Sequence, residues 1–167
     1  MTQSTPRKSS FPPVIDSRVR VLILGSLPGD RSLAARQYYA HPQNQFWRLM
    51  SAVLDRELTA LSYPDRLAAL LERHVGLWDV VATAHRPGST DAALSEIAPN
   101  DIAALAATLP NLRTIAFNGG TAFKHGLKQL GSTDHATIPL PSSSPLHTVG
   151  FDAKLPAWLE LREHLRH

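Results

Sequence analysis

The chain has 167 residues, a formal net charge of +3 and no cysteine. Its length predicts one domain with a core that folds without cross-links, and the lack of cysteine excludes disulfides, thiolate metal sites and a cysteine nucleophile. No apolar run approaches the ~18 residues that span a bilayer, and the N-terminus lacks the apolar stretch of a signal peptide, so we expect a cytoplasmic protein without a membrane segment.

The predicted elements begin after a tail. Residues 1–18 are rich in serine and proline, and they predict a flexible arm or a tail that lies against the surface, followed by a single domain at residues 19–167. Short apolar runs typical of buried strands then alternate with amphipathic patterns typical of helices. The strand-like runs cover residues 19–24, 76–81, 114–117 and 136–140. The helical patterns cover residues 43–54, 64–74, 101–109 (capped by Asn100), 121–130 and 156–165.

This alternation predicts an α/β fold, a three-layer α/β/α sandwich around a central, mainly parallel four-stranded sheet. The last strand contains Pro139 and should therefore lie at an edge. Ligands of such sheets bind beyond the carboxyl ends of the strands. The candidate site is therefore expected in the segments that follow the four strands, residues 25–44, 82–91, 118–121 and 141–148.

The charge is divided unevenly along the chain. Residues 1–50 carry +5, residues 51–110 carry −4 and residues 111–150 carry +2. This division predicts a basic face that attracts a polyanion such as nucleic acid, although four of the seven early basic residues lie in the first twenty positions. The remaining basic side chains that flank the segments after the strands are Arg31, Arg36, Arg48, Lys124 and Lys128.

The sequence GSLPG (residues 25–29) directly follows the first predicted strand. Its two glycines allow backbone amides to approach a ligand closely. It lacks the Gly-Lys-Ser/Thr of a Walker A loop and does not fit GxGxxG. Both a ligand-binding loop and an ordinary strand-to-helix turn explain it equally well.

The sequence YYAHPQNQFW (residues 38–47) crowds aromatic, histidine and amide side chains together before a helix. Aromatic faces stack on nucleobases, and Asn or Gln amides hold a water molecule or read a base edge. Phe46 and Trp47 have the spacing of a helix core face. Packing explains Tyr39 and Asn44 less well, so these two are candidates for binding.

The sequence PSSSPLH (residues 141–147) follows the fourth predicted strand. Its hydroxyls and amides suit phosphate contacts, and Leu146 could act as an apolar wedge; the alternative is an ordinary surface loop. A serine hydrolase is not indicated because no GxSxG is present. The eight histidines show no HxH or HExxH pattern, so no metal site is predicted, but His41, His85 and His147 fall in the segments after the strands.

Five segments of the chain resemble, in this order, motifs of the uracil-DNA glycosylase superfamily: GSLPG, SLxxxxYYAHPQNQFW, GLWDVVxxxxRPGSxD, FNGGTAF and LPSSSP. The resemblance covers about residues 19–148 and is greatest to the hypoxanthine-DNA glycosylase branch, near the mismatch-specific uracil/thymine enzymes. It implies a domain that flips a nucleotide out of DNA and hydrolyses the bond to its deaminated base, hypoxanthine or uracil. We expect a monomer that acts on double- or single-stranded DNA, is associated at most with a bacterial nucleoid, and needs no metal or cofactor.

The resemblance also implies roles by position. Asn44 would position the water, and Tyr39 would stack on the flipped base. The residues implied to bind the base are Gly25, Ser26, Leu27, Pro28, Gly29, Tyr39 and Asn118. The residues implied to bind DNA are His41, Ser142, Ser143, Ser144, Pro145, Leu146 and His147.

Three departures from the related branches indicate a slower or broader enzyme. Leu27 stands where those branches have a water-activating Asp or Asn, and Ser142 stands where many have a histidine that stabilises departing uracil. The predicted end of the second strand, residues 81–82, lacks the Asn that reads uracil in the strictest branch.

No lysine stands at a matching site to form a Schiff base, so we expect no lyase activity. One alternative is a catalytically impaired module of the same fold that binds lesion or abasic DNA. Another is a nucleotide-binding α/β protein, which the missing phosphate-binding lysine disfavours.

Overall fold

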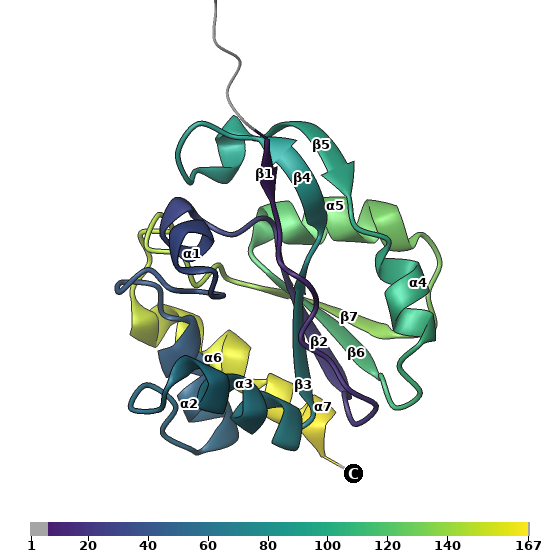
Figure 1. Ribbon diagram of the computed structural model, residues 1–167. Coiled ribbons are helices and arrows are strands. Elements are labelled where there is room, and N and C mark those ends of the chain that lie inside the picture. The colour runs from purple at the N-terminus through teal and green to yellow at the C-terminus, as the bar shows by residue number, and fades with distance from the viewer. Residues whose placement is uncertain (1–6, 167) are drawn as a thin grey trace, which may run out of the picture.

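The computed structural model describes residues 7–166 (Figure 1). A central sheet of four parallel strands has the order β3-β2-β6-β7. Its strands are β2 (Val21–Gly25), β3 (Val75–Asp79), β6 (Thr114–Asn118) and β7 (Ala136–Leu140). This confirms the predicted sheet, with the proline-containing strand at an edge. The second strand ends at Asp79, two residues earlier than predicted.

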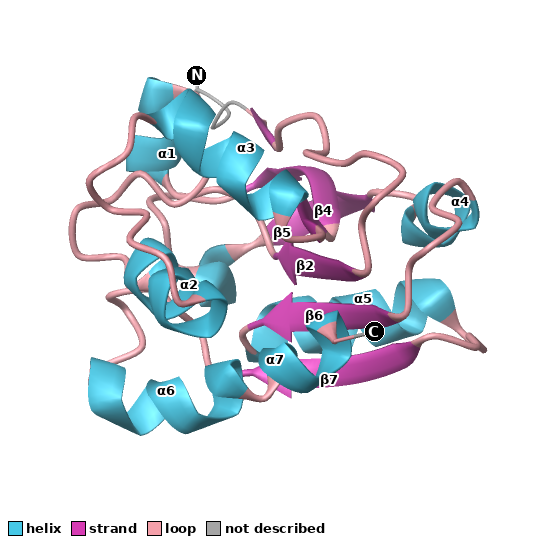
Figure 2. Ribbon diagram, turned by 90° about the horizontal axis from the view of Figure 1, so that it is seen from below, coloured by secondary structure: helices cyan, strands magenta, loops and turns pink. Residues whose placement is uncertain are grey.

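Helices cover both faces of this sheet because side chains of β2 alternate between two cores. Val21 and Ile23 pack with α2 (Phe46–Leu54), α3 (Tyr63–Glu72), α6 (Phe151–Leu159) and α7 (Leu161–Leu165). Leu22 and Leu24 pack with α4 (Ile102–Ala107) and α5 (Gly120–Leu130). Figure 2 shows strands of the sheet between α2 and α6 on one side and α4 on the other. The predicted three-layer sandwich is therefore confirmed.

A second, antiparallel sheet of order β1-β4-β5 was not predicted. It contains β1 (Lys8–Ser9), β4 (Val81–His85) and β5 (Ser95–Pro99), with a 3₁₀ helix η1 (Asp91–Ala93) before β5. Residues 82–91 were expected to form a loop after the second strand, and this is wrong for residues 82–85, which belong to β4, and for residue 91, which begins η1. Register shifts interrupt the pairing of β4 with β5, so the sequence has no regular alternation that would mark a strand.

Several helix boundaries also differ from the predictions. Helix α1 (Asp30–Ala35) was missed, and α6 begins at Phe151 with Pro156 inside it. Helix α4 is capped by the Asp101 carboxylate, which accepts from the amide of Ala104 at 3.0 Å. The predicted cap, Asn100, instead donates from Nδ2 to the carbonyl of Asp79 at 2.8 Å.

The N-terminal residues from position 7 onward lie against the domain, as in the second interpretation of the tail. Lys8 and Ser9 pair with β4, and Val14 forms a bridge with Leu77. The Lys8 ammonium donates to Asp30 Oδ1 at 2.6 Å. Residues 1–6 of the predicted arm lie outside the described residues, as does residue 167. Within residues 7–166, no helix is long and apolar enough to cross a membrane.

Candidate active site

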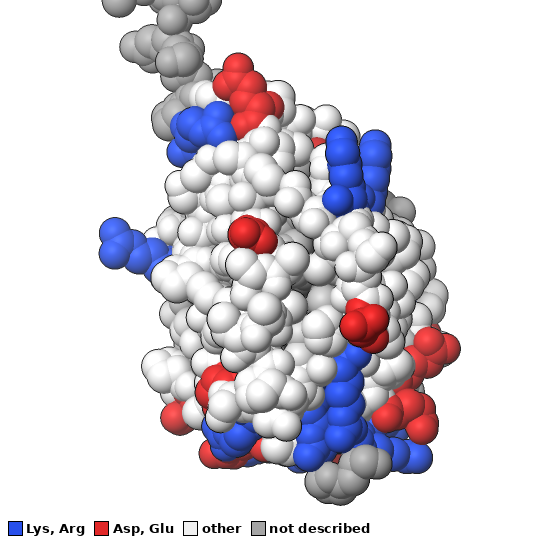
Figure 3. Space-filling view, turned by 90° about the vertical axis from the view of Figure 1, so that its right-hand side faces the viewer, with Lys and Arg blue, Asp and Glu red and all other residues white. Residues whose placement is uncertain are grey.

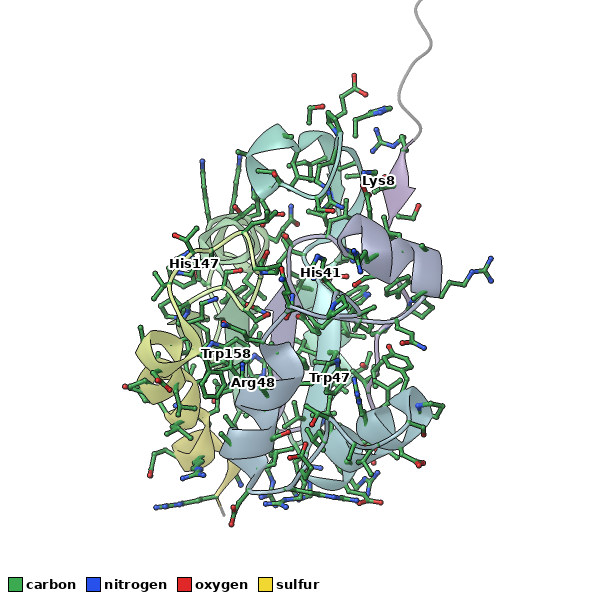
Figure 4. The ribbon with its side chains drawn as sticks, turned by 90° about the vertical axis from the view of Figure 1, so that its left-hand side faces the viewer. Lys8, His41, Trp47, Arg48, His147 and Trp158 are labelled. Atoms are coloured by element: carbon green, nitrogen blue, oxygen red, sulfur yellow. The ribbon has the colours of Figure 1, made fainter. Side chains whose placement is uncertain are left out.

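A cavity of about 590 Å³ opens beyond the carboxyl ends of the parallel strands. Every residue to which the sequence analysis gave a role toward the base, the water or DNA lines it, in the segments 25–29, 39–44, 118 and 142–147. Figure 4 views the molecule from the side on which His41 and His147 lie, on loops above the helix that carries Trp47 and Arg48. The fold thus brings four sequence-distant segments to one place, as expected for a parallel sheet.

Backbone hydrogen bonds fix the orientation of the 25–29 loop. The carbonyls of Gly25 and Ser26 accept from the amides of Val80 and Val81 at 2.8 and 3.0 Å. The next two carbonyls, of residues 27 and 28, accept from Nη1 and Nη2 of Arg86 at 3.2 and 2.6 Å. In a trans peptide the N–H points opposite to the preceding carbonyl. The amides of residues 26, 27 and 29 are therefore turned away from these partners.

Arg86 is a buried cation that holds this loop. Its side chain is fully buried, and its Nε donates to the carbonyl of Gly88 at 2.8 Å. Arg86 therefore donates to three loop carbonyls, those of residues 27, 28 and 88. The planar guanidinium, with several N–H donors in fixed directions, suits such a set of acceptors. The Asp30 carboxylate lies 3.9 Å from Nη2 and partly compensates the charge.

Gly25 lies where two polar side chains approach the backbone. A Cβ atom at this position would come within 2.7 Å of Asp79 Oδ1 and 3.2 Å of the Tyr39 hydroxyl. Only glycine leaves room for both groups. Gly25 also pairs with Asp79 in the register of β2 and β3. Asp79 is the last residue of the edge strand β3, and it lines the cavity.

Asp79 is buried, with 3% of its surface exposed, and its Oδ2 has no hydrogen-bond partner among residues 7–166. Burial and, to a smaller extent, the nearby Asp91 raise the pKa of this carboxyl to about 8, although Arg86 opposes the shift. The carboxyl is therefore largely protonated at neutral pH. Asp91 lines the same cavity, its Oδ1 accepts from the Ser26 hydroxyl at 2.8 Å, and burial raises the pKa of Asp91 as well.

Tyr39 adopts a left-handed backbone conformation with φ of 56°. Its ring stacks on Phe46 with a centroid distance of 3.9 Å and an interplanar angle of 20°. One ring face is thus covered, and only the other can meet a ligand. Burial and the neighbouring Asp79 raise the pKa of the hydroxyl, whereas the Asn118 amide lowers it, although no atom meets the hydroxyl with hydrogen-bond geometry within residues 7–166.

Asn44 lies two residues before the start of helix α2, and its side-chain oxygen ties it to the helix. Its Oδ1 accepts from the amide of Phe46 at 2.9 Å, and its backbone N–H donates to the carbonyl of His41 at 2.9 Å. The bond to Phe46 fixes which side-chain atom is the oxygen. An amide oxygen has two lone pairs, so one remains for a further donor such as water.

The serine loop, residues 142–147, is tied to the sheet and to α6. The Asn118 amide donates from Nδ2 to the Ser143 hydroxyl at 2.9 Å and accepts at Oδ1 from the Ser143 amide at 2.9 Å. Asn118 therefore holds this loop in addition to lining the cavity. From α6, the fully buried Lys154 donates to the carbonyls of Ser144 and His147 at 3.4 and 3.3 Å.

Leu146 projects from this loop and is 57% exposed, and within residues 7–166 only Val149 is a second large apolar side chain that is exposed. Its amide donates to the Ser144 hydroxyl at 3.1 Å, so a local turn keeps the side chain outward. Gly119 makes room beneath the loop: its φ is +100°, and an added Cβ would lie 3.1 Å from Ser142 Cβ.

A second cavity of about 610 Å³ adjoins the first and shares Tyr39, His41 and Asn44 with it. Arg48 lies over the ring of Phe151 at 4.3 Å on its wall. Basic charge is not confined to this region. Figure 3 shows the face of α4 and α5 with scattered charges of both signs, and basic side chains also gather at its lower end, toward the C-terminus.

Three polar residues of the site received no role from the sequence, although they belong to the motif GLWDVVxxxxRPGSxD: Asp79, Arg86 and Asp91. Asp79 was not expected at the site because the second strand was predicted to continue to residue 81, which placed Asp79 inside the strand. Arg86 and Asp91 fell in a segment expected to be a loop, where charged side chains normally face solvent. Among residues 7–166, no group of three or more His, Asp and Glu side chains could hold a metal ion.

Comparison with known proteins links the site to a family. The sequence profile of the uracil DNA glycosylase superfamily matches residues 12–166. A hypoxanthine DNA glycosylase of Methanosarcina barkeri (strain Fusaro) is 37% identical over 156 residues, which are 92% of this chain and 97% of that protein. A hypoxanthine DNA glycosylase of Methanosarcina acetivorans is 40% identical over 139 residues, 82% of this chain and 86% of that protein.

A similar solved structure is a Methanosarcina acetivorans protein, determined by solution NMR as a candidate uracil DNA glycosylase. It superposes with a TM-score of 0.85 at 36% sequence identity, and the match covers 97% of this chain and 100% of that one.

Proposed function

Since the chain belongs to the uracil DNA glycosylase superfamily, we propose that it hydrolyses the N-glycosidic bond of deaminated bases in DNA, hypoxanthine first and uracil second. The observation that carries the proposal is the convergence of Asn44, the 25–29 loop and the serine loop on one cavity. Its volume of about 590 Å³ lies within the usual range of small-molecule sites. The bond cannot be reached inside a stacked duplex, so the nucleotide must be flipped into this cavity.

Asn44 is the residue we assign to the water. Its Oδ1 keeps one lone pair beyond the bond to the amide of Phe46, and a water that donates to it is oriented toward the sugar carbon. The backbone N–H of Asn44 is bonded to the His41 carbonyl, and helix α2 begins two residues later, so the backbone that carries this side chain is held on both sides. Catalysis then comes mainly from positioning, which is a large contribution when geometry is held in advance.

The 25–29 loop is the element we assign to the departing base. Negative charge spreads over the base as the glycosidic bond breaks, and amides that already point toward it stabilise that charge without reorganisation. The four carbonyls of residues 25–28 are held by Val80, Val81 and Arg86. The opposite amides of residues 26, 27 and 29 are thus preset as donors, whereas the Leu27 side chain supplies none.

The exposed Leu146 and the hydroxyls beside it are the part we assign to DNA. An apolar side chain that enters the base stack fills the gap left by a flipped nucleotide, and serine hydroxyls and amides bind phosphate. No lysine is found among the described residues that line the cavity, which supports a monofunctional enzyme without lyase chemistry. We expect it to act as a monomer on the lesion strand.

Asn44→Ala tests the assignment. Single-turnover release of hypoxanthine from a duplex should fall at least ~10²-fold, because a positioned catalytic group is lost. Gln43→Ala is the matched control, since Gln43 is the exposed neighbour and should keep the wild-type rate. A folded Asn44→Ala protein with unchanged base release would disprove the role of Asn44.

The competing function is a module that binds lesion or abasic DNA without releasing a base. The apolar Leu27, which packs with Val81 and Ala84, favours it because no carboxylate is available there to polarise water. Such a module would bind damaged duplexes with an affinity that falls steeply with salt. It would release neither hypoxanthine, uracil, xanthine nor mismatched thymine, so one panel of four duplexes separates the two functions.

A further inference from the structure

Asp79 is the polar group of the cavity that the mechanism above leaves unused. It lies at the carboxyl end of β3 with 3% of its surface exposed, and its backbone is held by the bond from Asn100 to its carbonyl. Oδ1 sits above Gly25, and Oδ2 has no partner among residues 7–166. A buried polar atom without a partner is costly, and Asp79 is one of the residues that line the cavity, where a ligand could satisfy it.

The surroundings of Asp79 favour a neutral carboxyl. The titratable and charged groups that face it are Tyr38, Tyr39, Asp91 and Arg86. Arg86 directs its donors to the carbonyls of residues 27, 28 and 88 rather than to Asp79. Asp91 is a like charge, and burial raises the pKa of both tyrosines, so both stay uncharged. Nothing in this shell neutralises a carboxylate at position 79 by a direct ion pair.

We propose that Asp79 reads the flipped base as a neutral carboxylic acid, which accepts from the ring N–H and donates to the adjacent exocyclic oxygen. This inference rests on the proposed glycosylase function and adds a substrate class to it. Hypoxanthine, uracil and xanthine share this N–H and C=O pair, and a carboxylic acid offers the complementary acceptor and donor side by side. A carboxylate could only accept, and its second oxygen would face the lone pairs of the base.

The donated hydrogen bond also favours the reaction. As the base leaves, negative charge reaches its exocyclic oxygen, and a donor at that point becomes stronger in a site closed to water. A carboxylic acid kept neutral by its apolar surroundings is known to serve as such a donor. No proton needs to be transferred: the O–H of Asp79 stays on the carboxyl while the glycosidic bond breaks.

The test compares wild type, Asp79→Asn and Asp79→Ala in single-turnover release of hypoxanthine between pH 6 and 9.5. Asparagine keeps both an acceptor and a donor but cannot ionise. We expect Asp79→Asn to stay within ~10-fold of wild type at pH 7 and Asp79→Ala to fall ~10²–10³-fold, as for loss of an oxyanion donor. Above pH 8 the ratio of the wild-type rate to the Asp79→Asn rate should fall ~10-fold per pH unit as the acid ionises.

Ionisation of the base itself affects both proteins equally, so their difference isolates Asp79. An Asp79→Asn profile that declines in parallel with wild type would overturn the proposal, as would wild-type activity in a folded Asp79→Ala. The carbon-13 titration of the Asp79 carboxyl in the free wild-type protein gives an independent readout. A midpoint above 7 supports a neutral acid at neutral pH, and a midpoint below 7 refutes it. If wild type releases no base at all, the proposed function fails first and the inference falls with it.

Discussion

Replacing Gly25 with alanine should destabilise the fold and slow base release together. The new Cβ would lie 2.7 Å from Asp79 Oδ1 and 3.2 Å from the Tyr39 hydroxyl. Neither group can move freely, because Asp79 is buried at a strand end and the ring of Tyr39 is stacked on Phe46. The overlap must therefore be relieved by shifting β2 against β3, and overpacking of this kind costs ~1–3 kcal/mol.

Urea unfolding with a constant m-value measures the loss of stability, and single-turnover release of hypoxanthine measures the loss of function. We expect the rate to fall at least ~10-fold, since small displacements of catalytic groups are costly. Gly120→Ala is the control for stability: Gly120 begins α5, and an added Cβ there meets nothing within 4 Å, so the helix should gain ~0.4–1 kcal/mol. A Gly25→Ala protein as stable and active as wild type would refute the close approach of Asp79 and Tyr39.

Three further predictions concern the buried ionisable side chains of Arg86, Lys154 and Asp79. Arg86→Lys should lower the free energy of unfolding in urea by at least ~2 kcal/mol, because one ammonium cannot serve the three carbonyls that the guanidinium holds; an unchanged midpoint would contradict this. Lys154→Met keeps the apolar stem but removes the donors to Ser144 and His147, so base release should fall ~10-fold in a folded protein, whereas an unaltered rate would show that the loop needs no such support. Because the pKa of Asp79 rises from 3.8 to about 8 on folding, its contribution to stability is complete below pH 4 and lost as the pH rises toward 8; the stability difference between wild type and Asp79→Asn should decrease across that window, and a flat difference would argue against the shift.

The sequence predicts the central sheet because β2, β6 and β7 are short apolar runs between helical patterns. It also places the candidate site, since segments that follow parallel strands must meet at one edge. The water-positioning role of Asn44 came from the resemblance to the family, whereas the wedge role of Leu146 was already indicated by its place in the serine loop. The structure adds the bond from the Phe46 amide and the exposed position of the leucine.

The sequence could not reveal the polar groups beneath the cavity. Asp79 was assigned to the interior of a strand that actually ends there, and strand boundaries are set by pairing rather than by composition. Arg86 is buried because three carbonyls from two loops meet at its side chain. The sequence around Arg86 does not show that carbonyls from two separate loops meet at its side chain, and an arginine is normally expected at the surface.

The most direct test of the central claim is the product analysis of a duplex that carries one hypoxanthine, incubated with excess wild-type protein and with Asn44→Ala. Mass spectrometry of the supernatant detects the free base, and gel electrophoresis before and after alkali detects strand breaks. We predict free hypoxanthine and a strand that stays intact until alkali is added, with both signals reduced at least ~10²-fold in Asn44→Ala. Tight binding of the duplex without any free base would contradict the claim.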